Sequence, residues 1–392
     1  MKRVLGGVLA ALLVVTSAYA MEFSQIFTSP TSQMTYAIAP DGTLWRWGGS
    51  GSGLLEDWTG AHTEPEQIST DTDWASVSVG RDVVHLVKAD GSRYVTGDLT
   101  QAGDGSSGYN TDIVAVSDGF VWTAVEGNGS TNAGIQADGS LWVWGTDATG
   151  TGSPEATPTS LLIGDGGPEE WTDVYVYGNT SYAQRSNGEL WAWGINTGTF
   201  AAGGPILVGT GFTSVVEGQP DSMLLETHAV AVKDDGTVWA WGNGSNCQLE
   251  PSGGSCVDSA TPVQIDAGPV KQAFSSESGS FILKEDGTIW MLGYAMLTSG
   301  GLFPNTAFTQ LSAETFDEIY LTSQGLIAKH TNGEYWGVGN NSLGNLGTGD
   351  TAFVSAIAPT MHRYGAPLVM SVFPDGSEVP KYAGHIYLQL NL

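Results

Sequence analysis

Short stretches rich in β-branched and aromatic residues, separated by glycine-rich turns, fill most of the chain. Residues 228–233 (HAVAVK) and 237–242 (TVWAWG) are two such stretches, and the pair Asp235-Gly236 joins them. This composition is typical of β-strands, and an Asp-Gly pair favours a tight hairpin turn because glycine adopts positive φ without steric cost. Two further strands are expected at 212–218 and 261–265. One unit of the chain therefore comprises four short strands.

The same unit recurs along the chain at an almost constant distance. The turn glycines are Gly42, Gly91, Gly139, Gly188, Gly236, Gly287 and Gly333, so their spacings are 49, 48, 49, 48, 51 and 46 residues. A period near 50 residues with four strands per period is typical of a propeller blade. The sequence therefore predicts an all-β fold, a seven-bladed β-propeller of four-stranded blades that is closed by terminal strands.

Most copies carry a tryptophan pair in the pattern Leu-Trp-x-Trp-Gly. Two residues that are two positions apart in a strand point to the same side, so each pair is expected to pack between adjacent blades rather than to bind a ligand. The predicted structural residues are Trp45, Trp47, Trp142, Trp144, Trp191, Trp193, Trp239, Trp241, Trp290 and Trp336. The second copy has Tyr94 and Thr96 instead, which predicts looser packing of that blade.

These motifs resemble the repeat of the regulator-of-chromosome-condensation family. The resemblance rests on the stretch around Asp235 to Gly242, on Cys247-Gln248-Leu249 after it, and on residues 336–349. It covers roughly residues 22–350 and implies a seven-bladed propeller. Some exported bacterial members bind a target protein, β-lactamase, with the loops of one face, so the resemblance implies a binding propeller. The family's nuclear exchange-factor role is not expected here because the chain is acidic and carries an export signal.

The first twenty residues have the features of a signal peptide. Lys2 and Arg3 precede the apolar segment 4–15, and Ala18-Tyr19-Ala20 matches an A-x-A cleavage site. We expect three parts: a signal peptide at 1–20, the propeller at 21–350, and a C-terminal segment at 351–392 that completes or closes it. A retained N-terminal anchor is the alternative to cleavage. Residues 385–392 alternate like a strand that closes the ring, or else serve in export or anchoring.

The balance of charges limits the partners that the protein can bind. The chain has 41 acidic residues against 13 Lys and Arg, for a net charge of −28 at pH 7. Such a surface repels phosphate backbones and anionic lipid, so nucleic acid is not an expected partner. No membrane span is expected after cleavage, and the protein is predicted to be periplasmic or extracellular. Export makes a disulfide between Cys247 and Cys256 plausible.

Strand connectivity assigns the loops to two ends of the ring. Successive strands are antiparallel, so the loop between strands one and two shares an end with the loop that follows Trp-Gly, opposite the Asp-Gly turns. The stretches from Gly119 to Asp138 and from Gly218 to Asp235 are longer than their counterparts and predict insertions at that end. Varied loops favour a binding surface. Its candidate residues are Trp58, Tyr109, Trp122, Glu126, Phe200, Tyr294 and Phe303, with Glu56 and Asp57 nearby.

No catalytic or metal-binding motif is recognisable in the sequence. No two of the six histidines stand at metal-ligand spacing, and neither a Gly-x-Ser-x-Gly elbow nor a nucleotide-binding glycine motif occurs. No metal and no cofactor are therefore expected, with Ca²⁺ as the alternative. Our leading hypothesis is a non-catalytic, monomeric, exported propeller that binds a protein. A surface glycan, an adhesive or structural role, and an enzyme acting on polysaccharide or peptide at the central channel are the alternatives.

Overall fold

Twenty-eight strands and one short 3-10 helix make up the part of the chain that the computed structural model describes. The described residues are 23–29, 32–49, 62–128, 130–146, 149, 154–163, 170–177, 180–194, 203–218, 227–249, 256–276, 279–293, 305–322 and 325–361. They belong to one unit, Phe23–His362. Within them, no helix has both the length and the apolar character needed to cross a lipid bilayer.

The strands form seven separate antiparallel sheets, each made of four consecutive strands. The first sheet consists of β1 (Gln25–Phe27), β2 (Met34–Ile38), β3 (Leu44–Gly48) and β4 (His62–Ser69). The second consists of β5 (Trp74–Val79), β6 (Val83–Lys88), β7 (Arg93–Asp98) and β8 (Tyr109–Ala115), with helix η1 (Leu99–Gln101) between β7 and β8. The third consists of β9 (Trp122–Gly127), β10 (Thr131–Gln136), β11 (Leu141–Gly145) and β12 (Glu155–Ser160).

The remaining four sheets repeat this order. The fourth consists of β13 (Trp171–Tyr177), β14 (Thr180–Arg185), β15 (Glu189–Gly194) and β16 (Gly203–Thr210), and the fifth of β17 (Phe212–Glu217), β18 (His228–Lys233), β19 (Val238–Gly242) and β20 (Ser259–Asp266). The sixth consists of β21 (Val270–Ser275), β22 (Gly279–Lys284), β23 (Ile289–Gly293) and β24 (Asn305–Gln310), and the seventh of β25 (Phe316–Thr322), β26 (Gly325–His330), β27 (Tyr335–Gly339) and β28 (Val354–Met361).

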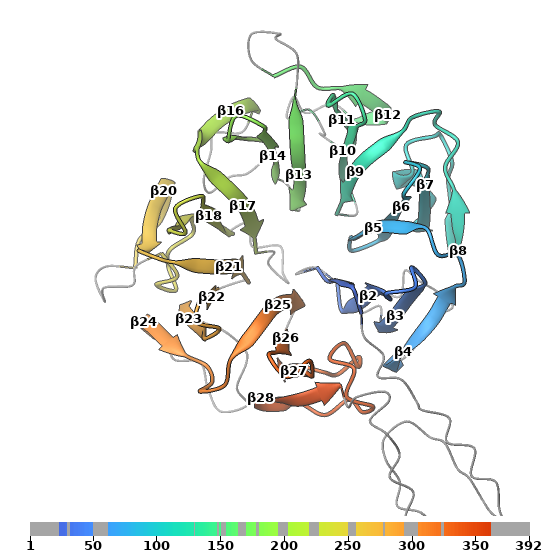
Figure 1. The fold of residues 1–392 in the computed structure, drawn as a ribbon. Coiled ribbons are helices and arrows are strands. Elements are labelled where there is room, and N and C mark those ends of the chain that lie inside the picture. Colours follow the sequence, from blue (N-terminus) through green and yellow to red (C-terminus); the bar gives the residue numbers. More distant parts are fainter. Residues whose placement is uncertain are drawn as a thin grey trace, which may run out of the picture. The chain divides into compact units, whose positions relative to one another are not determined.

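The sheets are arranged as blades around a ring, with the first strand of each blade toward the centre and the fourth at the periphery (Figure 1). The prediction of a seven-bladed, four-stranded propeller is confirmed. The strands expected at 212–218, 228–233, 237–242 and 261–265 correspond to β17, β18, β19 and β20. The last strand of the seventh blade, β28, lies within the segment 351–392. Residues 1–20 and 385–392, where we expect the signal peptide and a closing strand, lie outside the described residues.

The Asp-Gly turns are built by hydrogen bonds that the motif itself contains. In blade one, Gly42 has φ of 83°, and the Asp41 carboxylate accepts from the Thr43 amide at 3.0 Å and from its hydroxyl at 2.6 Å. The Thr43 hydroxyl in turn accepts from Trp45 Nε1 at 2.9 Å. The same relay recurs at Asp138, Asp235 and Asp286. The turn therefore sets the position of the first tryptophan of each pair.

The second tryptophan of each pair packs between adjacent blades. Trp193 of blade four lies in one cluster with Ile135 and Leu141 of blade three, and Trp191 packs against the same cluster. Trp47, Trp144, Trp193 and Trp241, the second residues of their pairs, are all at most 3% exposed. A fully buried indole removes a large apolar area from water, so these side chains supply much of the energy that holds neighbouring blades together.

Blade two also differs from the other blades at the first residue of its third strand, β7. Other blades have an apolar residue there, whereas blade two has Arg93, whose side chain is fully buried. Its guanidinium forms an ion pair with Asp118 at 2.6 Å and lies 5.5 Å and 4.9 Å from the ring centres of Trp122 and Trp144. The junction of blades two and three is therefore filled by a paired charge between two indoles.

Among the described strands, blades seven and one are each formed by four consecutive strands, and side chains connect the two blades. Trp47 Nε1 donates to the Asn345 carbonyl oxygen at 3.1 Å, and the Thr35 hydroxyl donates to the same oxygen at 3.3 Å. Phe23 stacks on Trp47 with ring centres 5.4 Å apart, and its ring centre lies 6.5 Å from that of Tyr335 in blade seven. Closure thus depends on side chains and on the loop that carries Asn345.

Substituting Trp47→Phe tests this junction. The change removes one hydrogen bond that crosses between blades and leaves a cavity, so we expect a loss of roughly 2–3 kcal/mol in the free energy of unfolding. Trp45→Phe is the matched control, because Trp45 lies on the same strand and its indole nitrogen bonds only to the turn of its own blade. Urea denaturation followed by circular dichroism measures both. Equal losses in the two variants would contradict the special role of Trp47.

Candidate functional site

The two ends of the ring differ in the length of their connections. At one end, which we call the turn end, the second and third strands of each blade are joined by three to five residues. At the opposite end, the loop end, eight to sixteen residues join the third and fourth strands. The first and second strands are also joined at the loop end. The loop end is therefore the more elaborate of the two.

Only one of the two predicted insertions is present at the loop end. In blade five, β17 ends at Glu217 and β18 begins at His228, so the insertion between Gly218 and Asp235 is confirmed. In blade three the prediction was wrong, because Gly119 is not the glycine that ends the first strand. Gly119 has φ of 77° in the link before β9, at the turn end, and Gly127 ends the strand. The β9–β10 connection is short.

Trp122 is not a surface binding residue. Placing the first strand of blade three too early moved Trp122 into a loop, whereas it is the first residue of β9 and is 2% exposed. Its ring packs against Trp144 with centres 5.6 Å apart, and its Nε1 donates to Asp118 at 3.0 Å. This position is the apolar anchor of the innermost strand, which Trp74, Trp171 and Phe212 occupy in other blades.

The other predicted binding residues fall into three groups. Trp58, Phe200, Tyr294 and Phe303 lie outside the described residues, as do Glu56 and Asp57. Tyr109 lies at the loop end, where it is 38% exposed and its hydroxyl donates to the Asp82 carbonyl oxygen at 3.1 Å. Glu126 is the next-to-last residue of β9, at the loop end of that strand, and faces the central channel.

Two further exposed apolar residues at the loop end escaped the sequence analysis. Val257 is 62% exposed just before β20, and Phe353 is 40% exposed just before β28. Both stand at the ends of long connections between third and fourth strands. The only sequence signal for them is their position within loops of variable length.

Three described connections at the loop end hold the next blade in place. The carbonyl oxygens of Gln101, Gln248 and Asn345 accept hydrogen bonds from Trp144, Ser280 and Trp47 of the following blade, at 2.7, 3.1 and 3.1 Å. Gln248 and Asn345 belong to the stretches that carry the family resemblance. These inner parts of the loops are therefore structural.

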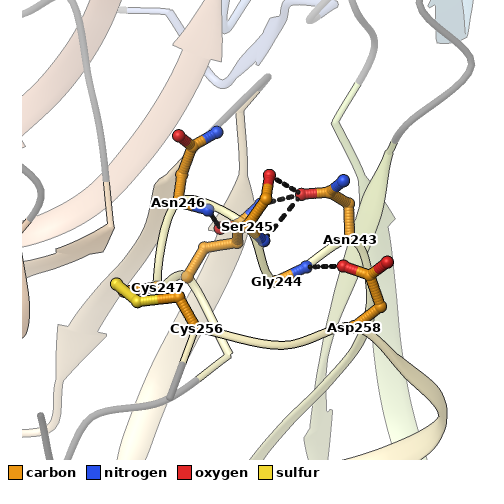
Figure 2. Close-up of a disulfide and its surroundings, with 8 residues drawn as sticks. Asn243, Gly244, Ser245, Asn246, Cys247, Cys256 and Asp258 are labelled. Carbon is orange, nitrogen blue, oxygen red and sulfur yellow. Dashed lines mark hydrogen bonds between the residues drawn. A yellow bond between two sulfur atoms is a disulfide. The ribbon is translucent and has the colours of Figure 1, made fainter. Parts of the chain in front are cut away.

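The disulfide predicted between Cys247 and Cys256 is present and ties the loop between β19 and β20. Figure 2 shows the bond beside a network in which the Asn243 side chain accepts from the Ser245 amide and hydroxyl. Asp258 accepts from the Gly244 amide at 2.9 Å. Cys247 has a positive φ of 64°, and glycine, Gly344, occupies the corresponding position in the loop of blade seven. The disulfide and the hydrogen bond from Gly244 to Asp258 thus hold the two ends of this loop together.

A cavity of about 240 Å³ lies in the central channel. It is lined by the last residues of the innermost strands, which run from the turn end toward the loop end, so it occupies the loop-end half of the channel. The side chains that give it its character are Phe27, Ser78, Glu126, Asn128, Tyr175, Tyr177, Phe274 and Tyr320. They come from six blades, so no single repeat contains the site.

Glu126 is the one carboxyl group among the described residues that line this cavity. Its Oε2 accepts from the Ser78 hydroxyl at 2.6 Å, and the Ser78 oxygen accepts from the Gly127 amide at 3.1 Å. Burial raises the pKa of Glu126 to about 7, although the bond from Ser78 acts in the opposite direction. Burial thus disfavours the ionised form of the one carboxyl group among the described residues of the lining.

A second carboxyl group with a raised pKa belongs to Glu217, near the end of β17. Its side chain does not line the cavity but lies between blades four and five. It is 2% exposed, and it accepts hydrogen bonds from the hydroxyls of Tyr182 at 2.7 Å, of Thr180 at 3.4 Å, and of Thr227. Thr227 stands at the far end of the blade-five insertion. Burial raises the pKa of Glu217 to about 7, against the effect of these bonds. Glu217 thus fastens the insertion to blade four.

Paired carboxyl groups for acid–base chemistry would both have to face the substrate. Among the described residues that line the cavity there are one carboxyl group and no histidine. His85 and His228 are buried within the blades, where burial lowers the pKa of each to about 3. Within the described part of the chain, no three His, Cys, Asp or Glu side chains are grouped to hold a metal ion.

Comparisons with known proteins identify the fold. No family model matches the chain, and no curated protein matches it. Human WBSCR16 has a similar structure, with a TM-score of 0.66 at 18% identity, over 80% of this chain and 92% of that one. Prp20p from Saccharomyces cerevisiae has a TM-score of 0.66 at 13% identity, over 87% of each chain.

The same yeast protein in a second structure, where it is called yeast RCC1 and is bound to Kap60, has a TM-score of 0.65 at 14% identity, over 91% of each chain. Likeness at these identities establishes the fold. The chain therefore shares the seven-bladed propeller fold of these proteins, and the fold implied by the resemblance of its repeats is confirmed.

Glu217 makes stability depend on pH. The unfolded carboxyl group ionises near pH 4.5 and the folded one near 7, so its contribution is fully present below 4.5 and is lost as the pH rises through 7. Glu217→Gln cannot ionise, so its stability relative to the parent should rise by about 3 kcal/mol between pH 4.5 and 8. Urea midpoints at both pH values measure this. The exposed Glu66→Gln is the control, and a pH-independent difference for Glu217→Gln would contradict the assignment.

Proposed function

We propose that this protein is a non-catalytic binding propeller that recognises a protein partner with its loop end. The observation that carries the proposal is the difference between the two ends of the ring. Turns of three to five residues recur at the turn end, whereas the loop end carries all connections between third and fourth strands, the blade-five insertion and the disulfide. Varied loops on a rigid scaffold are the usual location of binding residues.

Structural relatives support binding rather than catalysis as the function. The structure of yeast Prp20p is described together with its binding to Gsp1p and histones, and the same protein was solved bound to Kap60. Fold likeness does not transfer a partner, but it shows that a propeller of this kind serves as a protein-binding scaffold. The strongly acidic composition, with a net charge of −28, disfavours a nucleic acid as the partner here.

The setting that we propose is outside the cytoplasm. The N-terminal signal motif, the Cys247–Cys256 disulfide and the acidic composition agree with an exported protein. No cofactor is part of the proposal, and the propeller is proposed to act as a monomer. A surface glycan is the second candidate ligand, because the exposed aromatic ring of Tyr109 lies at the loop end.

Capture experiments with loop-end variants test the proposed surface. A partner isolated from the native envelope or culture fluid on the immobilised propeller should bind Tyr109→Ala and Val257→Asp at least tenfold more weakly, if these residues lie in the contact. Leu162→Asp is the matched control, since Leu162 is 75% exposed in the β12–β13 link at the turn end. Dissociation constants measured by calorimetry decide the outcome. Loss of binding in the Leu162 variant alone would place the contact at the turn end.

A further inference from the structure

The central cavity combines aromatic walls with a single acidic group. Five aromatic side chains line it, from blades one, four, six and seven: Phe27, Tyr175, Tyr177, Phe274 and Tyr320. The faces of aromatic rings attract cations, and a carboxylate supplies a formal counter-charge. Among the described residues of this lining, Glu126 is the one that can carry a full charge. The lining therefore favours a ligand that is positively charged and partly apolar.

The charge of Glu126 has no cationic partner in the described part of the chain. Ser78 donates a hydrogen bond to one carboxylate oxygen, and no ion pair involves Glu126. Burial disfavours the ionised form of this carboxyl group, which explains why the pKa of Glu126 is raised. An entering cation would reverse this effect, because attraction between opposite charges is strong where water is displaced.

The size of the cavity limits what can enter. About 240 Å³ is less than the usual 300–1,000 Å³ of a site for a drug-sized ligand, so the cavity accommodates one side chain or a small amine rather than an oligosaccharide. Its position in the loop-end half of the channel places it below the surface that we propose for partner binding. An alkyl chain with a positively charged tip matches the aromatic walls and the carboxylate of this lining.

We propose that this cavity is a binding site for an organic ammonium group, with the Glu126 carboxylate as its counter-ion and the aromatic rings as its walls. The ammonium group belongs either to a small alkylamine or to a lysine side chain of a polypeptide. The chemistry is the same in both cases. The site does not require that the loop end bind a folded partner, so it can be tested independently of the proposed function.

Binding of an ammonium group should be linked to ionisation of Glu126. The titratable groups that face Glu126 from the neighbouring blade are Tyr175 and Tyr177, whose pKa values burial raises further above 10, so neither ionises between pH 5 and 8. Ser78, on the other side, does not titrate. Affinity should therefore fall about tenfold per pH unit below 7 and level off above it. Glu217 also acts on Tyr177 and has a pKa near 7, so it needs its own control.

Calorimetric titration of the whole chain with n-butylammonium chloride tests the site, in phosphate buffer because amine buffers would compete. At pH 8 we expect saturable binding, at least tenfold tighter than binding of the neutral analogue 1-butanol. Glu126→Gln should weaken binding at least tenfold and abolish its pH dependence. Glu217→Gln, a second carboxyl group of similar pKa that does not line the cavity, should leave affinity and pH dependence unchanged.

Further variants and ligands make every outcome decisive. Val216→Trp fills the cavity without altering Glu126, so it should also prevent binding if Glu126→Gln fails to fold. The peptide Gly-Gly-Lys-Gly-Gly with blocked ends separates the two sources: binding comparable to butylammonium indicates a lysine side chain, and tenfold weaker binding indicates a small amine. Equal affinity for 1-butanol, unchanged affinity in the Glu126 variant, or no binding at all would overturn the proposal.

Discussion

Burial of aromatic side chains between neighbouring blades is the interaction on which the whole structure depends. A four-stranded sheet cannot bury its own faces, so each blade is stable only against the next, and the last must meet the first. Trp47 shows this most directly: it is fully buried, stacks on Phe23 and donates to the Asn345 carbonyl oxygen across the junction of blades seven and one. Because the ring is closed by such contacts, the channel keeps a defined shape.

The same constraint separates structural positions from functional ones. The turn end is occupied by hydrogen-bonded Asp-Gly turns, and the inner parts of the loop-end connections hold neighbouring blades through Gln101, Gln248 and Asn345. What remains free to vary is the outer part of the loops and the side chains that face the channel. Function is therefore expected where neither the blade core nor the junctions dictate the residue.

The packing of the blades around the channel also explains why the pKa values of two glutamates are raised. Glu126 and Glu217 both lie at the ends of innermost strands, where burial by the surrounding blades raises the pKa of each carboxyl group. Glu217 is satisfied by hydroxyls of Thr180, Tyr182 and Thr227 and joins the blade-five insertion to blade four. Glu126 faces the cavity and has only Ser78 as a hydrogen-bond partner among the described contacts. One carboxyl group is thus structural, and the other is available to a ligand.

The sequence by itself determined the blade, because the interactions that form it are local. The relay from Asp41 through Thr43 to Trp45 is complete within five residues and recurs in three other copies, so the turn and the strand after it can be predicted from the sequence. The sequence analysis placed Trp122 in a loop because it took Gly119, which lies in the link between two blades, for the glycine that ends a strand. The site was decided only by tertiary structure. The partner of Glu126 lies 48 residues away and the rings around it come from four other blades, so no repeat reveals which carboxyl group faces the channel.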